Sequence, residues 1–224
     1  MRLRGCTKSF EGGTVLRFPE LTLEPGQIYA AVGANGSGKS TFARLAAGVL
    51  PADQGVRVLE GVDVGYMPQK SYAFRMSTRA NVLLSGGDAA RAEKLMRALG
   101  LSELSGRRAS RLSGGETAKM ALARVLMRSH DLLILDEPTA SMDMESAMLT
   151  EELVETCRRE TGCAVLLITH DLQQARRMAD LALFFCRGEL WESGEASKVL
   201  YEPERAETRR FLDFYGGNAL ACFD

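Results

Sequence analysis

The stretch QIYAAVGANGSGKS, from Gln27 to Ser40, decides the fold. Its apolar part, Gln27 to Val32, predicts a buried strand that leads directly into a glycine-rich segment. Beyond that segment, apolar side chains between Thr41 and Val49 recur at helical spacing and predict a helix. Strand, glycine-rich turn and helix in this order form one half of a βαβ unit.

The glycine-rich segment matches the pattern G-x-x-x-x-G-K-[ST] at every fixed position. Its glycines let the backbone curl so that amide N–H groups point at a polyphosphate, and the following helix N-terminus adds positive charge. Lys39 is predicted to reach the β- and γ-phosphates, and the Ser40 hydroxyl to bind Mg²⁺. A turn without any ligand is the alternative, which the flanking strand and helix disfavour. The candidate nucleotide-binding residues here are Gly33, Asn35, Gly36, Ser37, Gly38, Lys39, Ser40 and Thr41.

Two carboxylates stand at the end of a second apolar run. Leu132 to Leu135 predicts a buried strand, and Asp136 and Glu137 follow it directly. Parallel sheets bind their ligands beyond the carboxyl ends of the strands. We therefore expect Asp136 to hold Mg²⁺ and Glu137 to orient or deprotonate an attacking water.

Composition excludes several classes of protein. The chain has 224 residues with 28 Lys+Arg against 29 Asp+Glu, a balance that argues against a nucleic-acid partner. No apolar run approaches the roughly 20 residues that a membrane helix needs, so membrane spanning would fall to other chains. The odd cysteine count and the lack of a C-x-x-C pair predict reduced thiols rather than disulfides or a zinc site. The five cysteines are Cys6, Cys157, Cys163, Cys186 and Cys222.

Apolar runs and turn residues alternate over the first 32 residues and predict β-strands joined by tight turns. Ser71 to Leu112 lacks strand signals and predicts a small helical insertion containing a helix from Ala89 to Leu99. Strands and helices then alternate, which predicts a parallel sheet covered on both faces, and the tail from Tyr201 onward predicts a terminal helix. The helices in this part are predicted at 116–127, 144–159 and 172–179, and a further strand at 164–168.

Further motifs make the sequence resemble the ATP-binding subunits of ABC transporters over roughly residues 1 to 200. Leu112–Glu116 (LSGGE) resembles the signature motif of that family, and Gln69 matches its Q-loop. Ala140–Asp143 matches the D-loop, and His170 matches the switch histidine. Phe10 stands where the family carries an aromatic side chain under the adenine, with a core aromatic as the alternative.

The resemblance implies a fold and a division of the chain. The fold is an α/β P-loop NTPase with a RecA-like parallel-sheet core, an N-terminal antiparallel β subdomain and a small helical subdomain. The whole chain, 1–224, would form a single ABC ATPase domain. Its core would comprise 1–70 and 113–200, the helical subdomain 71–112, and the C-terminal tail 201–224.

The resemblance also implies a mechanism with ATP and Mg²⁺. ATP would lie between the phosphate loop of one subunit and the signature motif of another in a head-to-tail homodimer or paired ATPase. The residues implied to contact nucleotide from the signature and D-loop are Ser113, Gly114, Gly115 and Asp143. The implied catalytic residues are Glu137, His170 and Gln69, and the implied metal contacts are Ser40, Gln69 and Asp136.

Transport is the function that the resemblance implies, with import favoured over export. The 71–112 block would dock integral membrane permease subunits, and an importer would add a secreted solute-binding protein. The chain is accordingly expected in the cytoplasm, peripheral on the inner face of the cell membrane. Met67 to Thr78 faintly resembles oxyanion importers of the tungstate and molybdate kind. The alternative is a non-transport ABC ATPase of the cell-division or repair type.

Three further features carry structural interpretations. Glu116 stands where the family commonly has Gln, and with Ser113 it also forms the pattern of a helix capping box. His130 precedes the 132–135 strand in a turn and is interpreted as solvated surface. The methionines, including Met142, Met144 and Met148, are interpreted as core filler.

Overall fold

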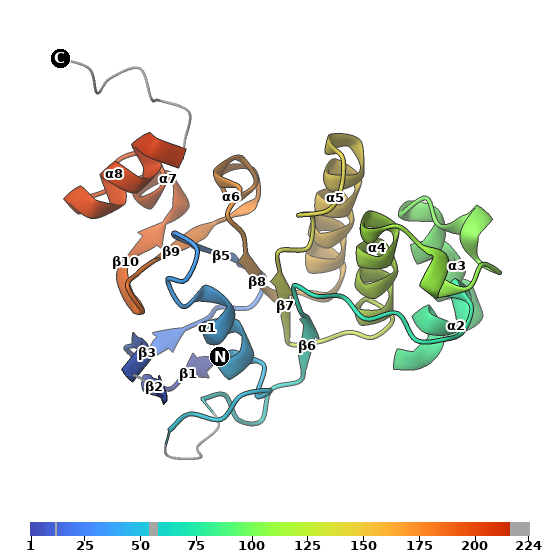
Figure 1. The fold of residues 1–224 in the computed structure, drawn as a ribbon, viewed down its shortest axis with the longest axis horizontal. Coiled ribbons are helices and arrows are strands. Elements are labelled where there is room, and N and C mark those ends of the chain that lie inside the picture. Colours follow the sequence, from blue (N-terminus) through green and yellow to red (C-terminus); the bar gives the residue numbers. More distant parts are fainter. Residues whose placement is uncertain (12, 54–57, 216–224) are drawn as a thin grey trace.

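A computed structural model describes residues 1–11, 13–53 and 58–215 and confirms the α/β class (Figure 1). Its main sheet has eight strands in the order β2-β3-β10-β9-β5-β8-β7-β6. The five strands from β9 to β6 run parallel. Their bounds are β5 Ile28–Val32, β6 Val64–Met67, β7 Leu132–Asp136, β8 Ala164–Ile168 and β9 Leu181–Cys186.

The central strands β5, β7 and β8 are buried at every position, because helices cover both faces of the sheet. Alternate residues of β7 face opposite layers. Leu132 and Ile134 pack in one core with α1 (Lys39–Ala46), whereas Leu133 and Leu135 pack in another with α4 (Gly114–Val125) and α5 (Met144–Thr161).

A third core lies at the β9 side of the sheet and holds the C-terminal helices. It joins α6 (Leu172–Met178), α7 (Ala196–Val199) and α8 (Ala206–Tyr215) to β5 and β9. The ring centroids of Phe184 and Phe211 lie 5.2 Å apart in this core. The predicted terminal helix is therefore confirmed, and it packs on the body of the molecule.

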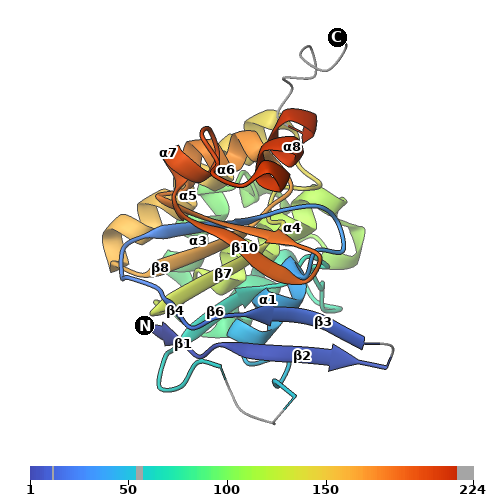
Figure 2. The same ribbon diagram turned by 90° about the vertical axis from the view of Figure 1, so that its left-hand side faces the viewer.

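The N-terminal strands are antiparallel, as the sequence predicts. Strand β1 (Arg2–Leu3) pairs with β4 (Leu21–Thr22), and β2 (Cys6–Phe10) pairs with β3 (Gly13–Phe18). Figure 2 shows β2 and β3 side by side at one end of the molecule. Strand β10 (Glu189–Glu195) pairs with both β3 and β9, so the hairpin continues the main sheet.

The segment from 71 to 112 is helical, and its helices pack against α4 (Figure 1). Asp88 caps α3, because its Oδ1 accepts the backbone N–H of Arg91 at 2.7 Å. An isolated bridge between Ser77 and Arg108 is the β pairing that the structure records within this segment. The helical elements are α2 Thr78–Val82, η1 Leu83–Ser85, α3 Ala89–Ala98, η2 Ser102–Leu104 and η3 Ala109–Arg111.

Two predicted helices begin earlier than their apolar patterns indicate. Helix α1 begins at Lys39 instead of Thr41 and ends at Ala46, and α4 begins at Gly114 instead of Glu116. In both helices the first residues belong to a sequence motif, the glycine-rich pattern in α1 and the LSGGE segment in α4. These residues show no apolar periodicity, so the pattern places the start of each helix too late. Helix α5 extends to Thr161 and ends where Gly162 adopts a left-handed conformation (φ +70°).

Two interpretations of single residues are wrong. His130 is not solvated surface, because its side chain is largely buried and its Nε2 lies 3.1 Å from the carbonyl oxygen of Val125. Met144 and Met148 are exposed on α5 rather than buried, and Met142 alone of the three packs against a core.

The structure describes four of the five cysteines and all the helices named above. Cys6, Cys157, Cys163 and Cys186 are free thiols, and Cys222 lies outside the described residues. In the part of the chain that the structure describes, no helix is both long and apolar enough to cross a membrane.

Candidate functional site

The glycine-rich loop after β5 adopts backbone angles that require glycine at two positions. Gly33 has φ +144°, and a Cβ there would lie 2.1 Å from the carbonyl oxygen of Phe185. Gly38 has φ +101°, and a Cβ there would lie 2.9 Å from Leu16 Cδ1. Both glycines are therefore fixed by conformation and by close neighbours. The turn after β9 also supports the loop, since the Gly188 N–H donates to the Ser37 carbonyl at 3.2 Å.

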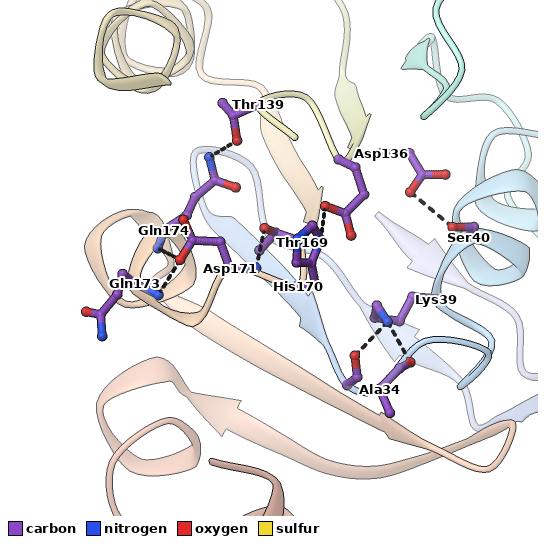
Figure 3. A network of polar contacts seen from close by, with 12 residues as sticks. Ala34, Lys39, Ser40, Asp136, Thr139, Thr169, His170, Asp171, Gln173 and Gln174 are labelled. Atoms are coloured by element: carbon purple, nitrogen blue, oxygen red, sulfur yellow. Dashed lines mark hydrogen bonds and ion pairs between the residues drawn. The ribbon is translucent and has the colours of Figure 1, made fainter. Parts of the chain in front are cut away.

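Lys39 is buried, and its ammonium group lies inside the curl of this loop (Figure 3). Its Nζ donates to the carbonyl oxygens of Gly33 at 2.7 Å and Ala34 at 2.9 Å. Burial lowers the pKa of Lys39, and the carboxylates of Glu137 and Asp136 oppose that shift. The loop thus holds one positive charge next to its backbone amides.

Asp136 ends β7 and is 1% exposed. The Ser40 hydroxyl donates to its Oδ1 at 3.1 Å, as Figure 3 shows. Its Oδ2 is buried and has no hydrogen-bond partner among the residues that the structure describes. Burial raises the pKa of Asp136 above its usual range. A hydroxyl beside a carboxylate with an unpartnered oxygen is a donor set that fits Mg²⁺, which prefers oxygen ligands.

Glu137 stands in a left-handed conformation (φ +54°), which is unfavourable for a residue other than glycine by about 1–3 kcal/mol. Its backbone N–H donates to the carbonyl oxygen of Ile168 at 2.9 Å. Its carboxylate is 8% exposed, and Oε2 lies 2.6 Å from Nδ1 of His170, which is 61% exposed. The carboxylate and the imidazole therefore form a pair at the edge of the site.

Gln69 and Phe10 are the predicted residues at the rim. Gln69 is exposed and lies two residues beyond β6, whose last residue pairs with Leu135 of β7, so it stands at the same sheet edge as Asp136. Phe10 is 48% exposed, and the Lys8 ammonium lies 5.3 Å from its ring centroid. The alternative of a core aromatic at position 10 is therefore wrong.

The signature motif forms the first turn of α4. Ser113 is the N-cap residue: its Oγ accepts the Glu116 N–H at 3.2 Å, and Glu116 Oε2 accepts the Ser113 N–H at 2.6 Å. Both bonds of the predicted capping box are present. The backbone bond from Ser113 holds the pKa of Glu116 below its usual range.

The signature motif and the D-loop pack together. A Cβ on Gly115 would lie 2.8 Å from the Ser141 carbonyl oxygen, and a Cβ on Gly114 would lie 3.5 Å from Ser141 Cβ. Asp143 caps α5, since its Oδ1 accepts the Ser146 N–H at 2.7 Å, and this bond lowers the pKa of Asp143.

The structure thus gathers the predicted residues into two groups. Lys39, Ser40, Asp136, Glu137 and His170 meet at the carboxyl ends of β5, β7 and β8. The signature motif and D-loop form a second group at α4. Figure 1 shows α4 well to the side of α1, with β6 and β7 between them.

One residue at the site escapes the sequence analysis. Gln174 of α6 is buried and binds Thr139, which follows Glu137 by two residues. Its signal in the sequence is slight: a polar residue between the apolar Leu172 and Ala175 of a short helix.

Comparisons with known proteins agree with this geometry. A family model described as ABC transporter matches residues 16–140. The chain is 36% identical over 228 residues to a zinc import ATP-binding protein of Chelativorans sp. (strain BNC1), covering all of this chain and 78% of that protein. It is 33% identical over 245 residues to a phosphate import ATP-binding protein of Natronomonas pharaonis, covering 95% of this chain and 86% of that protein. A tungstate uptake system ATP-binding protein of Peptoclostridium acidaminophilum is 36% identical over 201 residues, covering 83% and 94%.

Solved structures share the fold. An ATP-binding subunit of an ABC transporter superposes with a TM-score of 0.80 at 19% identity, covering 96% of this chain and 98% of that one. An ATP-binding cassette solved as a dimer in a post-hydrolysis state with ADP and Pi has a TM-score of 0.77 at 21% identity, covering 87% and 98%.

Proposed function

Because this chain belongs to the ABC transporter family as an ATP-binding subunit, we propose that it hydrolyses ATP between two copies to drive solute import through separate membrane subunits. The observation that carries the proposal is the group of Lys39, Ser40, Asp136, Glu137 and His170 at one edge of the sheet. This group supplies a cation and an anion-binding loop for phosphates, oxygen ligands for a metal, and a base.

The glycine-rich loop and Lys39 hold the phosphates of ATP. Amide N–H groups of the loop and the N-terminus of α1 point at the anion, and the Lys39 ammonium exchanges its bonds to loop carbonyls for bonds to phosphate oxygens. Ser40 and Asp136 would hold Mg²⁺, which would supply positive charge against the phosphates of ATP.

Glu137 acts as the base that orients and deprotonates the attacking water. A positioned general base contributes about 10²–10⁴-fold in rate. His170, at 2.6 Å, fixes the direction of the Glu137 carboxylate and extends toward solvent, where it can contact the γ-phosphate. Gln69 contributes a metal or water contact from the neighbouring strand, and Phe10 stacks under the adenine from the β2 end.

A second copy completes the nucleotide site. Figure 1 shows α4 apart from α1, the helix that follows the phosphate loop. Ser113, Gly114 and Gly115 form the beginning of α4, and Asp143 precedes α5. In a head-to-tail dimer they would face the γ-phosphate bound by the partner, so that two helix N-termini meet at one anion. Loss of the γ-phosphate removes that bridge and opens the dimer, which is the mechanical step.

The 71–112 segment docks the membrane subunits on the cytoplasmic face of the membrane. Tyr72 and Phe74 are exposed aromatic side chains in edge-to-face contact, with ring centroids 4.9 Å apart. Arg124 of α4 supports them: its guanidinium lies 5.4 Å from the Phe74 ring centroid and donates to the Tyr72 carbonyl at 2.9 Å. An exposed aromatic patch a few residues beyond Gln69 suits a partner that senses the nucleotide.

Import is the direction we propose, since the relatives above are named for zinc import, phosphate import and tungstate uptake. An importer of this kind would also require a secreted solute-binding protein. The names of these relatives favour import over the alternative of a non-transport ATPase.

The proposal is tested by reconstituting the chain with its co-purified membrane subunits and measuring ATP hydrolysis. Zinc, phosphate and tungstate are added in turn with the cognate binding protein, and one of them is expected to stimulate hydrolysis. A parallel preparation carrying Glu137→Gln measures the background. Wild-type hydrolysis no faster than that of this variant contradicts the ATPase assignment, and hydrolysis indifferent to the membrane subunits contradicts transport.

A further inference from the structure

We propose that Gln174 is a positioning residue: its buried amide holds the turn that carries Glu137 in register with α5 and α6. The inference rests on the proposed function, because it concerns the alignment of Glu137 as the base. It assigns a role in ATP hydrolysis to a side chain outside the motifs that bind nucleotide.

Gln174 joins three segments of the chain. Its side chain is 1% exposed, and its Nε2 donates to Thr139 Oγ1 at 2.9 Å and to Glu151 Oε1 at 3.1 Å. Thr139 belongs to the turn after β7, and Glu151 belongs to α5. Figure 3 shows the amide pointing from α6 toward Thr139.

The chemistry of its partners fixes the orientation of the amide. Glu151 is paired with Arg177, with an Nη2–Oε1 distance of 2.7 Å and an Nε–Oε2 distance of 3.0 Å, so both of its carboxylate oxygens act as hydrogen-bond acceptors. The NH₂ group of Gln174 must therefore face it. The Oε1 of Gln174 is buried and has no partner among the described residues, so the position serves donation alone.

The turn after β7, which Gln174 binds at Thr139, contains Glu137 in its left-handed conformation. Thr139 follows Glu137 by two residues, and the backbone between them turns sharply at the left-handed Glu137. Gln174 also belongs to α6, the short helix that begins two residues after His170, the partner of Glu137. Its backbone N–H donates to Asp171 Oδ1 at 3.1 Å, next to His170.

Gln174 thus acts on the contact between the Glu137 carboxylate and the His170 imidazole indirectly, through its hydrogen bond to Thr139. With the amide in place, the Glu137 turn and the His170 end of α6 move as one piece. Without its donation to Thr139, the turn loses a tether and the 2.6 Å contact between Glu137 and His170 loses its alignment. A misplacement of about 1 Å at a catalytic group lowers turnover by about 10²-fold, whereas the phosphate loop that binds ATP is untouched.

Gln174→Glu tests the inference with the smallest change of shape. The variant sets a second carboxylate against Glu151 Oε1, which can only accept, and the resulting repulsion should displace the side chain at position 174 from Thr139. We expect kcat for ATP hydrolysis to fall by about 10- to 100-fold with KM for ATP within about twofold. Gln173→Glu is the matched control, because Gln173 is exposed, points away from the site in Figure 3, and makes the same change of charge on the same helix. It should leave kcat within about twofold.

A second substitution supplies a rescue that a merely structural role would not show. Glu151→Gln combined with Gln174→Glu returns one donor and one acceptor to the 3.1 Å contact, and the Thr139 hydroxyl can donate to the new carboxylate. The double variant should recover at least about tenfold of the lost kcat. Thr139→Val, which removes the acceptor alone, should lower kcat in the same direction and decides the matter if Gln174→Glu does not fold.

Two results would overturn the inference. One is a Gln174→Glu enzyme, or a Thr139→Val enzyme where the former does not fold, with wild-type kcat. The other is a kcat loss that Gln173→Glu reproduces. Failure of the proposed function looks different: there the wild-type chain and Glu137→Gln hydrolyse ATP at the same rate, whatever residue stands at position 174.

Discussion

Asp136 and Glu137, to which the proposed function assigns the metal and the attacking water, are neighbours with features unfavourable to folding. Glu137 takes a left-handed backbone, and Asp136 buries a carboxylate with one oxygen unpartnered among the described residues. Neither feature improves the packing of β7. Such residues concentrate at functional sites, where the surrounding structure holds them in place.

Asp136→Asn should therefore stabilise the fold while it abolishes hydrolysis. The folded pKa of Asp136 lies above its ordinary value of 3.8, so the folded chain binds this proton more tightly than the unfolded chain. Asp136 therefore destabilises the folded chain increasingly as the pH rises from its unfolded pKa to its folded pKa. Above the folded pKa this destabilisation is complete. We expect Asp136→Asn to melt about 2–4 °C higher at neutral pH, as about 1 kcal/mol does in a chain of this size.

Thermal unfolding from about pH 4 to about pH 8 checks this expectation. The difference in melting temperature between Asp136→Asn and wild type should decrease as the pH falls toward 3.8. An Asp136→Asn protein that is less stable than wild type at neutral pH would show that the carboxylate is satisfied in the folded state.

Lys39→Ala should abolish nucleotide binding or turnover. The substitution removes the cation that the loop holds by two carbonyl contacts of 2.7 and 2.9 Å. Loss of one preorganised charge contact to the transferring phosphoryl group lowers turnover by about 10²–10³-fold. Titration with a fluorescent ATP analogue and steady-state hydrolysis measure the two effects, and undiminished hydrolysis would remove the assignment of the phosphate loop.

The sequence predicts the position of the glycine-rich loop between β5 and α1, and the positive φ angles of its glycines agree with a curled backbone. The assignment of its residues to nucleotide binding stays a prediction. The contact between Glu137 and His170 is different. It joins residues far apart in the chain. The family resemblance indicates each of the two residues, but it does not predict their contact. Gln174 cannot be predicted from the sequence for the same physical reason. A single polar residue in a short helix forms no pattern, and its partners Thr139 and Glu151 are distant in the chain.

Among the elements, α4 is the helix whose N-terminus the proposed mechanism presents to another copy. Ser113 and Glu116 satisfy its first N–H groups, and the D-loop packs closely on Gly115. Its beginning is thus rigid before any partner arrives. That rigidity limits which side chains the first turn tolerates.

Gly114 and Gly115 form a matched pair for substitution by alanine. Alanine is favoured over glycine in a helix by about 0.5–1 kcal/mol, so Gly114→Ala, whose Cβ meets Ser141 at an ordinary 3.5 Å, should raise the melting temperature. Gly115→Ala should lower it, because its Cβ would lie 2.8 Å from a backbone carbonyl oxygen that must move. Calorimetry of both variants decides, and equal melting temperatures would contradict the packing of the D-loop on α4.

Glu116→Gln should leave ATP turnover within a few-fold of wild type. The amide oxygen of glutamine can still accept the Ser113 N–H, so the capping box survives the loss of charge. Steady-state hydrolysis is the measurement. A collapse of turnover would mean that the carboxylate itself meets the nucleotide of the partner.

The central strands and the longer helices are predictable from sequence, because β5, β7 and β8 are apolar runs and the helices have apolar periodicity. The beginnings of α1 and α4 are harder to predict. Their first turns consist of residues of the glycine-rich pattern and of the LSGGE segment, which lack apolar periodicity. His130 and the exposed Met144 also depart from expectation, since the burial of a single side chain depends on neighbours distant in sequence.

At the scale of the whole molecule, the strand order depends on long-range pairing. The sequence predicts a parallel sheet and an antiparallel N-terminal part, and both are present. It does not predict that β10 connects them, because β10 pairs with β3 through a single register position, Glu189 with Arg17. The domain boundaries at 70 and 112 remain a proposal.

Glu137→Gln should trap an ATP-bound dimer. The amide cannot take a proton from water, so the γ-phosphate stays in place between the phosphate loop and the signature motif. Sedimentation with ATP and Mg²⁺ should give twice the mass of the chain, and sedimentation with ADP should give the monomer. A variant that stays monomeric with ATP would contradict the sandwich arrangement.

The separation of α1 from α4 within one chain has a kinetic consequence. In the proposed head-to-tail dimer each copy supplies only part of a catalytic centre, so the specific activity of isolated copies would rise with protein concentration. A scaffold that keeps two copies side by side turns that encounter into an intramolecular event, at an effective concentration on the order of millimolar. The membrane subunits could thus accelerate hydrolysis by tethering alone, without contributing a single atom to the reaction.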